Sequence, residues 1–354
     1  MTTPSAGTLS AGPAGLPGDP EPAGQEPNAT QEPNATQELI PTQELIYGCM
    51  GLGGSWSAEP YSSAHVDEAA AAVQAALDAG ITLFDHADIY RSGKAEAVFG
   101  EVLARTPGLR ERIRLQTKCG IRLGEQGLEA FYDLSRDGIL DRVNESLARL
   151  RTDYLDVLML HRPDPLLDPA EVASAVGQLM AEGKVRAVGV SNMSAPQIEL
   201  LQDRLEVPVV ANQLEMSLSA RAWLESTVLV NHAEGTDYSF PHGTVEHCVR
   251  RGITLQAYGA LARGLYTGAP AADPSAAETA TAALVAEMAA AKGTTGEAVV
   301  LGWLMKHPAG IAPVIGTAKP ERIRACAGAA EVAAAMTRAE WYRLWITARG
   351  SNIP

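Results

Sequence analysis

The chain has 354 residues, of which 46% are hydrophobic and 20% are charged, and it carries a formal net charge of -14. This composition is typical of a globular protein, and the acidic balance argues against nucleic acid or an anionic membrane as a partner, because both attract basic surfaces. The four cysteines are scattered, no apolar run is long enough for a membrane span, and no secretory signal pattern opens the sequence. We expect a cytoplasmic, monomeric protein.

The first 42 residues differ in composition from the rest of the chain. They are rich in Pro, Ala, Gly, Thr and Glu, and they repeat the hexapeptide Gln-Glu-Pro-Asn-Ala-Thr at 25–30 and 31–36. Such a segment cannot bury enough apolar surface to offset the entropy lost on ordering. We predict a disordered low-complexity extension over 1–42, followed by one folded domain over 43–354.

From residue 44 onward, short apolar runs alternate with amphipathic helical patterns. This alternation predicts parallel strands connected by helices, and eight such units imply closure into a (β/α)8 barrel of the α/β class. A longer irregular stretch is expected at about 226–243. Strands are predicted at 45–50, 81–85, 112–118, 154–160, 185–190, 208–213, 253–258 and 311–315, and helices at 65–79, 94–105, 135–150, 169–182, 195–204, 244–251, 276–291, 295–306, 319–331 and 337–348.

A glycine-rich turn after the first predicted strand raises the alternative of a doubly wound dinucleotide-binding fold. Its glycines, at 48, 51, 53 and 54, do not have the G-x-G-x-x-G spacing. Nor does a helical pattern begin directly after them, as binding of a pyrophosphate at a helix N-terminus requires. The barrel is therefore the favoured fold.

Four polar residues fall at or just after the ends of three consecutive predicted strands. Asp85 ends the second strand, with Tyr90 five positions further on. Lys118 ends the third strand, and His161 follows the fourth. Because the strand ends of a barrel converge on one rim, we expect these side chains to meet there. A carboxylate, a phenol, an ammonium and an imidazole together are suited to donating a proton.

The same region also raises the alternative of a metal site formed by Asp85, His86 and Asp88. Adjacent residues of a strand point to opposite faces, so a metal shared by Asp85 and His86 is disfavoured. We predict no metal site. The sequence offers no explanation for the histidine at position 86.

Several motifs, in order from residue 44 to the end, resemble those of the aldo-keto reductase superfamily, in its bacterial NADP-dependent oxidoreductase branch. They are the segment 80–90 with Glu96 and Gly100, Lys118, and the segments 160–164, 189–192, 212–213, 257–264 and 313–322. The resemblance implies a reductase of a small aldehyde or ketone. A free tyrosine has a pKa near 10. Lys118 would lower the pKa of Tyr90, the proton donor, while Asp85 orients Lys118 and His161 donates a hydrogen bond to the carbonyl oxygen.

The resemblance also implies NADPH as the cofactor. Ser191, Asn192 and Gln213 would bind the nicotinamide amide, and Tyr258 would stack on the ring. One departure is Cys326, where the family commonly has Asn, so that a contact to the adenine would be missing. The remaining expected contacts are to the pyrophosphate from Gly259, Leu261, Arg263 and Gly264, and to the 2′-phosphate from Gly316, Thr317, Lys319 and Arg322.

A rival interpretation is an NADP(H)-sensing regulatory binding protein, because the β subunits of voltage-gated potassium channels resemble the same family. The complete set of four catalytic residues favours the enzyme. The sequence identifies neither the physiological substrate nor the preferred direction of the reaction. Trp56 is interpreted equally well as a wall of the substrate pocket or as a plug of the barrel mouth, and the segment 228–244 as a lid or a simple insertion.

Overall fold

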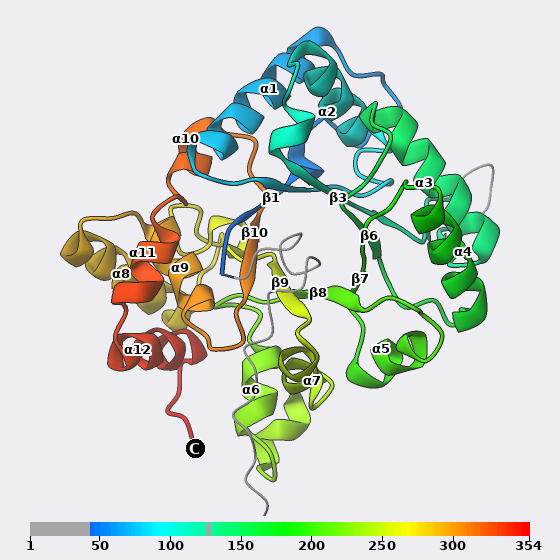
Figure 1. Ribbon diagram of the computed structural model, residues 1–354. Coiled ribbons are helices and arrows are strands. Elements are labelled where there is room, and N and C mark those ends of the chain that lie inside the picture. The colour runs from blue at the N-terminus through cyan, green and yellow to red at the C-terminus, as the bar shows by residue number, and fades with distance from the viewer. Residues whose placement is uncertain (1–42, 125–128) are drawn as a thin grey trace, which may run out of the picture. The chain divides into compact units, whose positions relative to one another are not determined.

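The computed structural model describes residues 43–124 and 129–354, so the predicted extension over 1–42 lies outside the described residues. Eight parallel strands form a closed barrel in the order β1-β10-β9-β8-β7-β6-β3-β2 (Figure 1). The prediction of a (β/α)8 barrel is confirmed. The barrel strands are β1 (Ile46–Gly48), β2 (Leu83–Asp85), β3 (Arg114–Cys119), β6 (Val157–Leu160), β7 (Val188–Ser191), β8 (Val209–Glu215), β9 (Thr254–Tyr258) and β10 (Ala312–Ile315).

Helices surround the barrel on its outer side (Figure 1). Several begin at a residue whose side chain accepts a hydrogen bond from the first turn, as Ser135 does from the Gly138 N–H and Asp168 from the Ala170 N–H. The helices are α1 (Ser63–Asp78), α2 (Lys94–Arg105), α3 (Arg136–Leu150), α4 (Pro169–Ala181), α5 (Ala195–Gln202), α6 (Ala222–Val228), α7 (Thr244–Arg251), α8 (Ala276–Lys292), α9 (Gly296–Met305), α10 (Pro320–Arg324), α11 (Ala329–Ala335) and α12 (Arg338–Arg349).

The structure differs from the predicted elements near the C-terminus and in one loop. The single helix expected over 319–331 is two helices, α10 and α11. The break lets α11 pack closely on α9, where a Cβ atom on Gly302 would lie 2.8 Å from Val332 Cγ1. A two-stranded hairpin of β4 (Ile121–Arg122) and β5 (Phe131–Tyr132) was not predicted, because two-residue strands carry too short a pattern.

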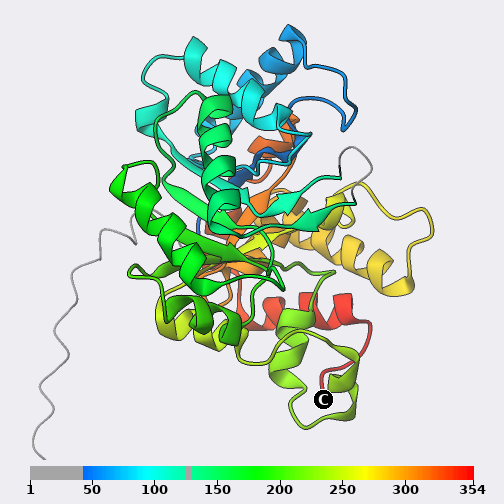
Figure 2. The ribbon, with the colours of Figure 1, turned by 90° about the vertical axis from the view of Figure 1, so that its right-hand side faces the viewer.

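The segment after α6, which was expected to be irregular, contains a short 3-10 helix, η3 (Ala233–Asp237). Glu225 of α6 is fully buried, and its carboxylate accepts hydrogen bonds from Trp345 Nε1 (2.9 Å) and Arg349 Nε (3.2 Å) of α12. Arg349 also pairs with Glu234 of η3, and Figure 2 shows the C-terminal helix beside this segment. These contacts favour an insertion packed on α12 over a lid.

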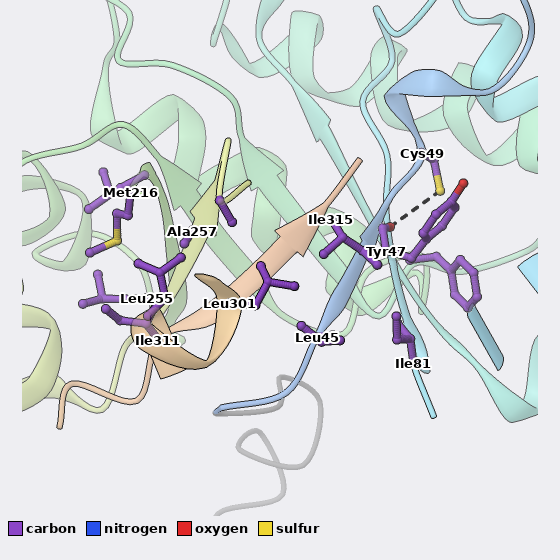
Figure 3. Packing of buried hydrophobic residues seen from close by; sticks show 14 of the residues in the cluster. Leu45, Tyr47, Cys49, Ile81, Met216, Leu255, Ala257, Leu301, Ile311 and Ile315 are labelled. Carbon is purple, nitrogen blue, oxygen red and sulfur yellow. Dashed lines mark hydrogen bonds between the residues drawn. The ribbon is translucent and has the colours of Figure 1, made fainter. Parts of the chain in front are cut away.

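The hydrophobic core lies between the strands and the surrounding helices. Figure 3 shows part of it, with Leu301 of α9 beside β9 and β10 and Tyr47 facing outward from β1. The neighbouring residue Ile46 belongs to a separate cluster with Leu83, Ala312 and Val314, as expected when alternate strand residues point into the barrel. Among the described residues, no helix is long and apolar enough to span a lipid bilayer.

Candidate active site

The strand register brings the four predicted catalytic residues to one end of the barrel. Asp85 of β2 is paired with Gln116 of β3, and Lys118 of β3 is paired with Met159 of β6, two residues before His161. Tyr90 follows β2 in a turn that continues through three residues with positive φ, at 91, 92 and 93. These positions place the carboxyl ends of three strands, and the side chains that follow them, side by side.

The Lys118 ammonium is the centre of this group. Its Nζ donates to Asp85 Oδ1 at 2.7 Å and Oδ2 at 2.6 Å, to the His86 carbonyl oxygen at 3.1 Å and to the Tyr90 hydroxyl at 3.1 Å. The side chains of Lys118 and Asp85 are only 1% and 2% exposed. A buried charge is retained only when it is paired and hydrogen-bonded, and both conditions are met here.

Burial and neighbouring charges act in opposite directions on the pKa values of Lys118 and Tyr90. Burial disfavours the Lys118 ammonium, but the Asp85 carboxylate and Tyr90 outweigh it and raise the pKa of Lys118. Burial raises the pKa of Tyr90, and Lys118 opposes this shift without reversing it. The lysine therefore acts on the tyrosine in the expected direction, but the Tyr90 pKa lies above its ordinary value, not below it. Tyr90 is accordingly a protonated phenol at neutral pH.

His161 lies edge-on to Tyr90, with ring centroids 6.1 Å apart. Burial, with the nearby charges of Lys118 and Arg162, lowers the pKa of His161 to about 2. Its Nδ1 is buried and has no hydrogen-bond partner among the described residues. A neutral imidazole has one N–H and one acceptor nitrogen, so His161 is able to donate one hydrogen bond without carrying charge.

The residues expected at the nicotinamide form a connected set beside these four. Ser191 Oγ donates to the Gln213 carbonyl oxygen (2.9 Å), and Asn192 Nδ2 donates to Ser191 Oγ (2.7 Å). The Tyr258 hydroxyl donates to Asn192 Oδ1 (3.0 Å). Asn192 has a φ of 58°, a conformation that asparagine tolerates better than most residues. Gln213 Nε2 lies 3.3 Å from Asp85 Oδ1, which joins this set to the group around Lys118.

The residues expected at the phosphates come from two segments that lie together. The loop after β9 contains η4 (Ala262–Gly264), with positive φ at Gly259, Ala262, Arg263 and Gly264. A Cβ atom on Gly264 would lie 2.9 Å from Arg322 Nη2, which places this loop against α10. Arg322 is partly exposed, 3.6 Å from Glu297 Oε1, and Lys319 at the start of α10 is exposed.

These two segments fit an elongated anionic cofactor. Gly259, Gly316, Arg263 and Lys319 are exposed, so backbone and cationic groups are accessible to phosphates along one stretch. The Tyr47 hydroxyl donates to the Thr317 carbonyl oxygen (3.1 Å) and fixes the segment before Lys319. Cys326 is fully buried and its Sγ donates to the Arg322 carbonyl oxygen, so its thiol faces the protein interior.

The polar residues between β2 and the Tyr90 turn, His86 and Asp88, are buried. The His86 ring packs on Phe99, with centroids 4.6 Å apart, and its nitrogens have no hydrogen-bond partner among the described residues. Asp88 Oδ2 lies 3.7 Å from Arg142 Nε. In the described part of the chain, no group of three or more His, Cys, Asp or Glu side chains is arranged to hold a metal ion.

Two residues of the site were not predicted from the sequence. Gln116 and Gln256 are fully buried and hydrogen-bond to each other across the barrel, and Gln116 Nε2 donates to Asp85 Oδ1 at 2.6 Å. Gln256 has a signal in the sequence, an amide flanked by apolar residues in Leu255-Gln256-Ala257, whereas Gln116 is followed by Thr117. Such a pattern marks an inward-facing polar group but does not identify its partner.

Comparison with known proteins identifies the family. The model of the "Aldo/keto reductase family" matches residues 44–344. The chain is 38% identical over 282 residues to the uncharacterized oxidoreductase YcsN of Bacillus subtilis, covering 78% of this chain and 87% of that protein. It is 36% identical over 314 residues to the 6-dehydroglucose reductase of Agrobacterium fabrum, covering 87% and 95%.

Solved structures support the same fold. A crystal structure of an aldo-keto reductase from Klebsiella pneumoniae in complex with NADPH superimposes with a TM-score of 0.64 at 24% identity, covering 85% of this chain and 89% of that one. The match to the family model spans all the elements that carry the candidate site. The chain therefore belongs to the aldo/keto reductase family of oxidoreductases.

Proposed function

We propose that this protein reduces a small aldehyde or ketone to an alcohol with NADPH, and that Tyr90 donates the proton. The observation that carries the proposal is the buried chain of contacts from Asp85 through Lys118 Nζ to the Tyr90 hydroxyl, 3.1 Å from the ammonium. The names of the relatives agree with it, since one is a 6-dehydroglucose reductase and a structural neighbour was crystallised with NADPH.

NADPH supplies the hydride when it is bound. Ser191, Asn192 and Gln213 would hold its nicotinamide amide, and Tyr258 would stack against the ring and restrict its orientation. The loop residues Gly259, Leu261, Arg263 and Gly264 would line the pyrophosphate. The 2′-phosphate would be held by Gly316, Thr317, Lys319 and Arg322, whose two cations suit a dianion.

The protein's own side chains would then deliver one proton to the substrate oxygen. His161, which is neutral, would donate a hydrogen bond to the substrate carbonyl oxygen and orient it beside the Tyr90 hydroxyl. As negative charge develops on that oxygen, the Tyr90 phenol transfers its proton to it. The Lys118 ammonium stabilises the phenolate that remains, and Asp85 keeps the ammonium charged and in place.

Replacement of Tyr90 by Phe tests the assignment of the acid. Tyr90→Phe removes only the hydroxyl, so turnover should fall by roughly 10²–10⁴-fold, the usual contribution of a positioned general acid. The affinity for NADPH, measured by fluorescence titration, should change little. Tyr342→Phe on α12 is the control and should leave both quantities unchanged. Retention of most of the activity in Tyr90→Phe would show that another group supplies the proton.

The rival function, an NADP(H)-sensing binding protein, makes a different prediction for the unmodified chain. A sensor would bind NADPH tightly but turn over no member of a panel of aldehydes and ketones. An enzyme would oxidise NADPH in the presence of at least one of them. Absorbance at the nicotinamide band, followed with and without each carbonyl compound, separates the two. The four assembled catalytic residues favour the enzyme.

A further inference from the structure

A layer of three glutamines lies in the barrel interior at the candidate site. Gln116 of β3, Gln213 of β8 and Gln256 of β9 are 0%, 2% and 0% exposed. Strands β3 and β9 are not neighbours in the barrel, so the contact between Gln116 and Gln256 crosses its interior. Such interiors are usually filled by branched apolar side chains, and a buried amide is costly unless it is hydrogen-bonded.

The hydrogen bonds of this layer converge on Gln256. Its Oε1 accepts from both Gln116 Nε2 and Gln213 Nε2, each at 2.9 Å. Its Nε2 donates back to Gln116 Oε1, also at 2.9 Å. The two ends of an amide have nearly the same shape, so its orientation is decided by its partners. Gln256 Oε1 therefore holds the Nε2 ends of both other amides, together with Asp85 Oδ1, which accepts from the same two nitrogens.

The first consequence concerns Asp85. The two nitrogens that donate to Gln256 also donate to Asp85 Oδ1. Gln116 Nε2 lies 2.6 Å from this oxygen and Gln213 Nε2 lies 3.3 Å from it. Donors aimed at a buried carboxylate stabilise its charged form. If either amide were reversed, its oxygen would face the carboxylate and repel it. The layer thus supports the anion that holds Lys118.

The second consequence concerns Gln213 itself. Its Nε2 is engaged by Gln256 and Asp85, and its Oε1 accepts no hydrogen bond from a described residue. The oxygen is therefore the end of this amide that is left for a ligand. An acceptor suits the NH2 group of the nicotinamide amide, whereas a reversed Gln213 would present a second donor to it.

We propose that Gln256 is a positioning residue, which orients Gln116 and Gln213 so that one carboxylate and one cofactor amide are both recognised. The inference rests on the proposed function, because it assumes that the nicotinamide binds at Gln213. A simple packing role is the alternative. A positioning role predicts that a substitution of Gln256 weakens the binding of the nicotinamide alone. A packing role predicts that ligands with and without the nicotinamide are weakened equally.

The test compares two ligands with and without the nicotinamide. Gln256→Leu removes the amide at similar volume, so we expect its Kd for NADPH to rise about tenfold. The tenfold rise corresponds to about 1.4 kcal/mol, lost at the nicotinamide. The Kd of Gln256→Leu for 2′-phospho-ADP-ribose, which lacks the nicotinamide, should therefore stay within about twofold of that of the unmodified protein. Thr254→Val, two residues earlier on the same strand and also buried, is the matched control and should bind both ligands normally.

A conservative variant provides a second readout that does not depend on activity. In Gln256→Glu a neutral carboxylic acid keeps one donor and one acceptor, whereas the carboxylate keeps acceptors only. Burial near Asp85 should raise the pKa of this new carboxyl. Both forms keep an acceptor for Gln213 Nε2, so we expect the Kd for NADPH of Gln256→Glu to stay within about twofold of that of the unmodified protein, in contrast to the rise in Gln256→Leu.

The outcomes separate this inference from the proposed function. If the unmodified protein binds NADPH but Gln256→Leu binds it equally well, or loses both ligands equally while remaining folded by urea titration, the positioning role is wrong. If Gln256→Leu does not fold, a Kd for NADPH raised about tenfold in Gln256→Glu, with the Kd for 2′-phospho-ADP-ribose unchanged, would overturn the inference in its place. If the unmodified protein binds neither ligand, the proposed function itself fails.

Discussion

The candidate site has two ends that are built in different ways: the end around Lys118, proposed to be catalytic (the catalytic end), and the end around Lys319 and Arg322, proposed to bind phosphate (the phosphate end). At the catalytic end, Lys118 and Asp85 are almost fully buried and already joined by hydrogen bonds of 2.6–2.7 Å. At the phosphate end, Lys319 is exposed and Arg322 is partly exposed, 3.6 Å from the carboxylate of Glu297. The first region is organised by the fold, whereas the second leaves its cations accessible to an anion. The difference predicts that mutations at the catalytic end affect stability, and mutations at the phosphate end affect binding.

The largest effect should come from removing the buried ammonium. Lys118→Met leaves the Asp85 carboxylate buried without its counter-ion, which typically costs about 3–5 kcal/mol of unfolding free energy. Urea titration at neutral pH measures this loss, and turnover should be lost as well. The double variant Asp85→Asn/Lys118→Met removes both charges and should recover part of the stability. A Lys118→Met protein as stable as the original would mean that the pair is not organised by the fold.

A second buried carboxyl tests the cost of a charge without a close partner. Burial and the nearby Glu96 raise the pKa of Asp88 to about 7, against the opposing charges of Arg142 and Arg149. Between about pH 4 and pH 7 the folded protein therefore holds a proton that the unfolded chain has released, so this residue makes stability fall as pH rises.

Replacement of Asp88 by Asn should remove the decrease in stability that Asp88 causes as pH rises. A shift of roughly three pKa units, at about 1.36 kcal/mol each, corresponds to about 4 kcal/mol. Compared with the original protein, Asp88→Asn should therefore gain up to about 4 kcal/mol of unfolding free energy at about pH 8 and nothing at about pH 4. Urea titrations of both proteins at the two pH values measure the difference. Asp137→Asn, on the exposed face of α3, is the control. An equal stability difference at both pH values would contradict the assigned ionisation.

The sequence was sufficient for the barrel because its signals are local and repeated. Each strand and helix carries its own apolar pattern, and Asp85, Lys118 and His161 stand at or just after strand ends, where the fold brings them together. The raised pKa of Tyr90 was not predicted, because it depends on burial by segments remote in the chain. The link from Gln116 to Gln256 was missed for the same reason, since it joins residues 140 positions apart.

At the phosphate end, removal of one cation should weaken binding without unfolding the protein. Arg322→Ala should raise the Kd for NADPH by roughly 10–100-fold, as loss of a charge-assisted contact of about 1.5–3 kcal/mol implies. Affinity for NADH, which lacks the 2′-phosphate, should change little. Arg324→Ala removes a cation of the same helix that pairs with Asp78 at the surface, and it should affect neither ligand. Equal losses for NADPH and NADH would show that Arg322 does not recognise the 2′-phosphate.

The smallest effect is expected at Trp56, on the loop after β1. Its side chain is 46% exposed, and the Arg91 guanidinium lies 5.4 Å from its ring centroid. A residue this exposed does not plug the barrel, so Trp56→Ala should cost only about 0.5–1 kcal/mol of unfolding free energy, the value of an exposed cation–π contact. If Trp56 instead forms a wall of the pocket, the same variant should raise KM for the carbonyl substrate while kcat and the Kd for NADPH stay constant. A loss of stability above about 3 kcal/mol, which large-to-small changes cause in a packed core, would restore the interpretation as a plug.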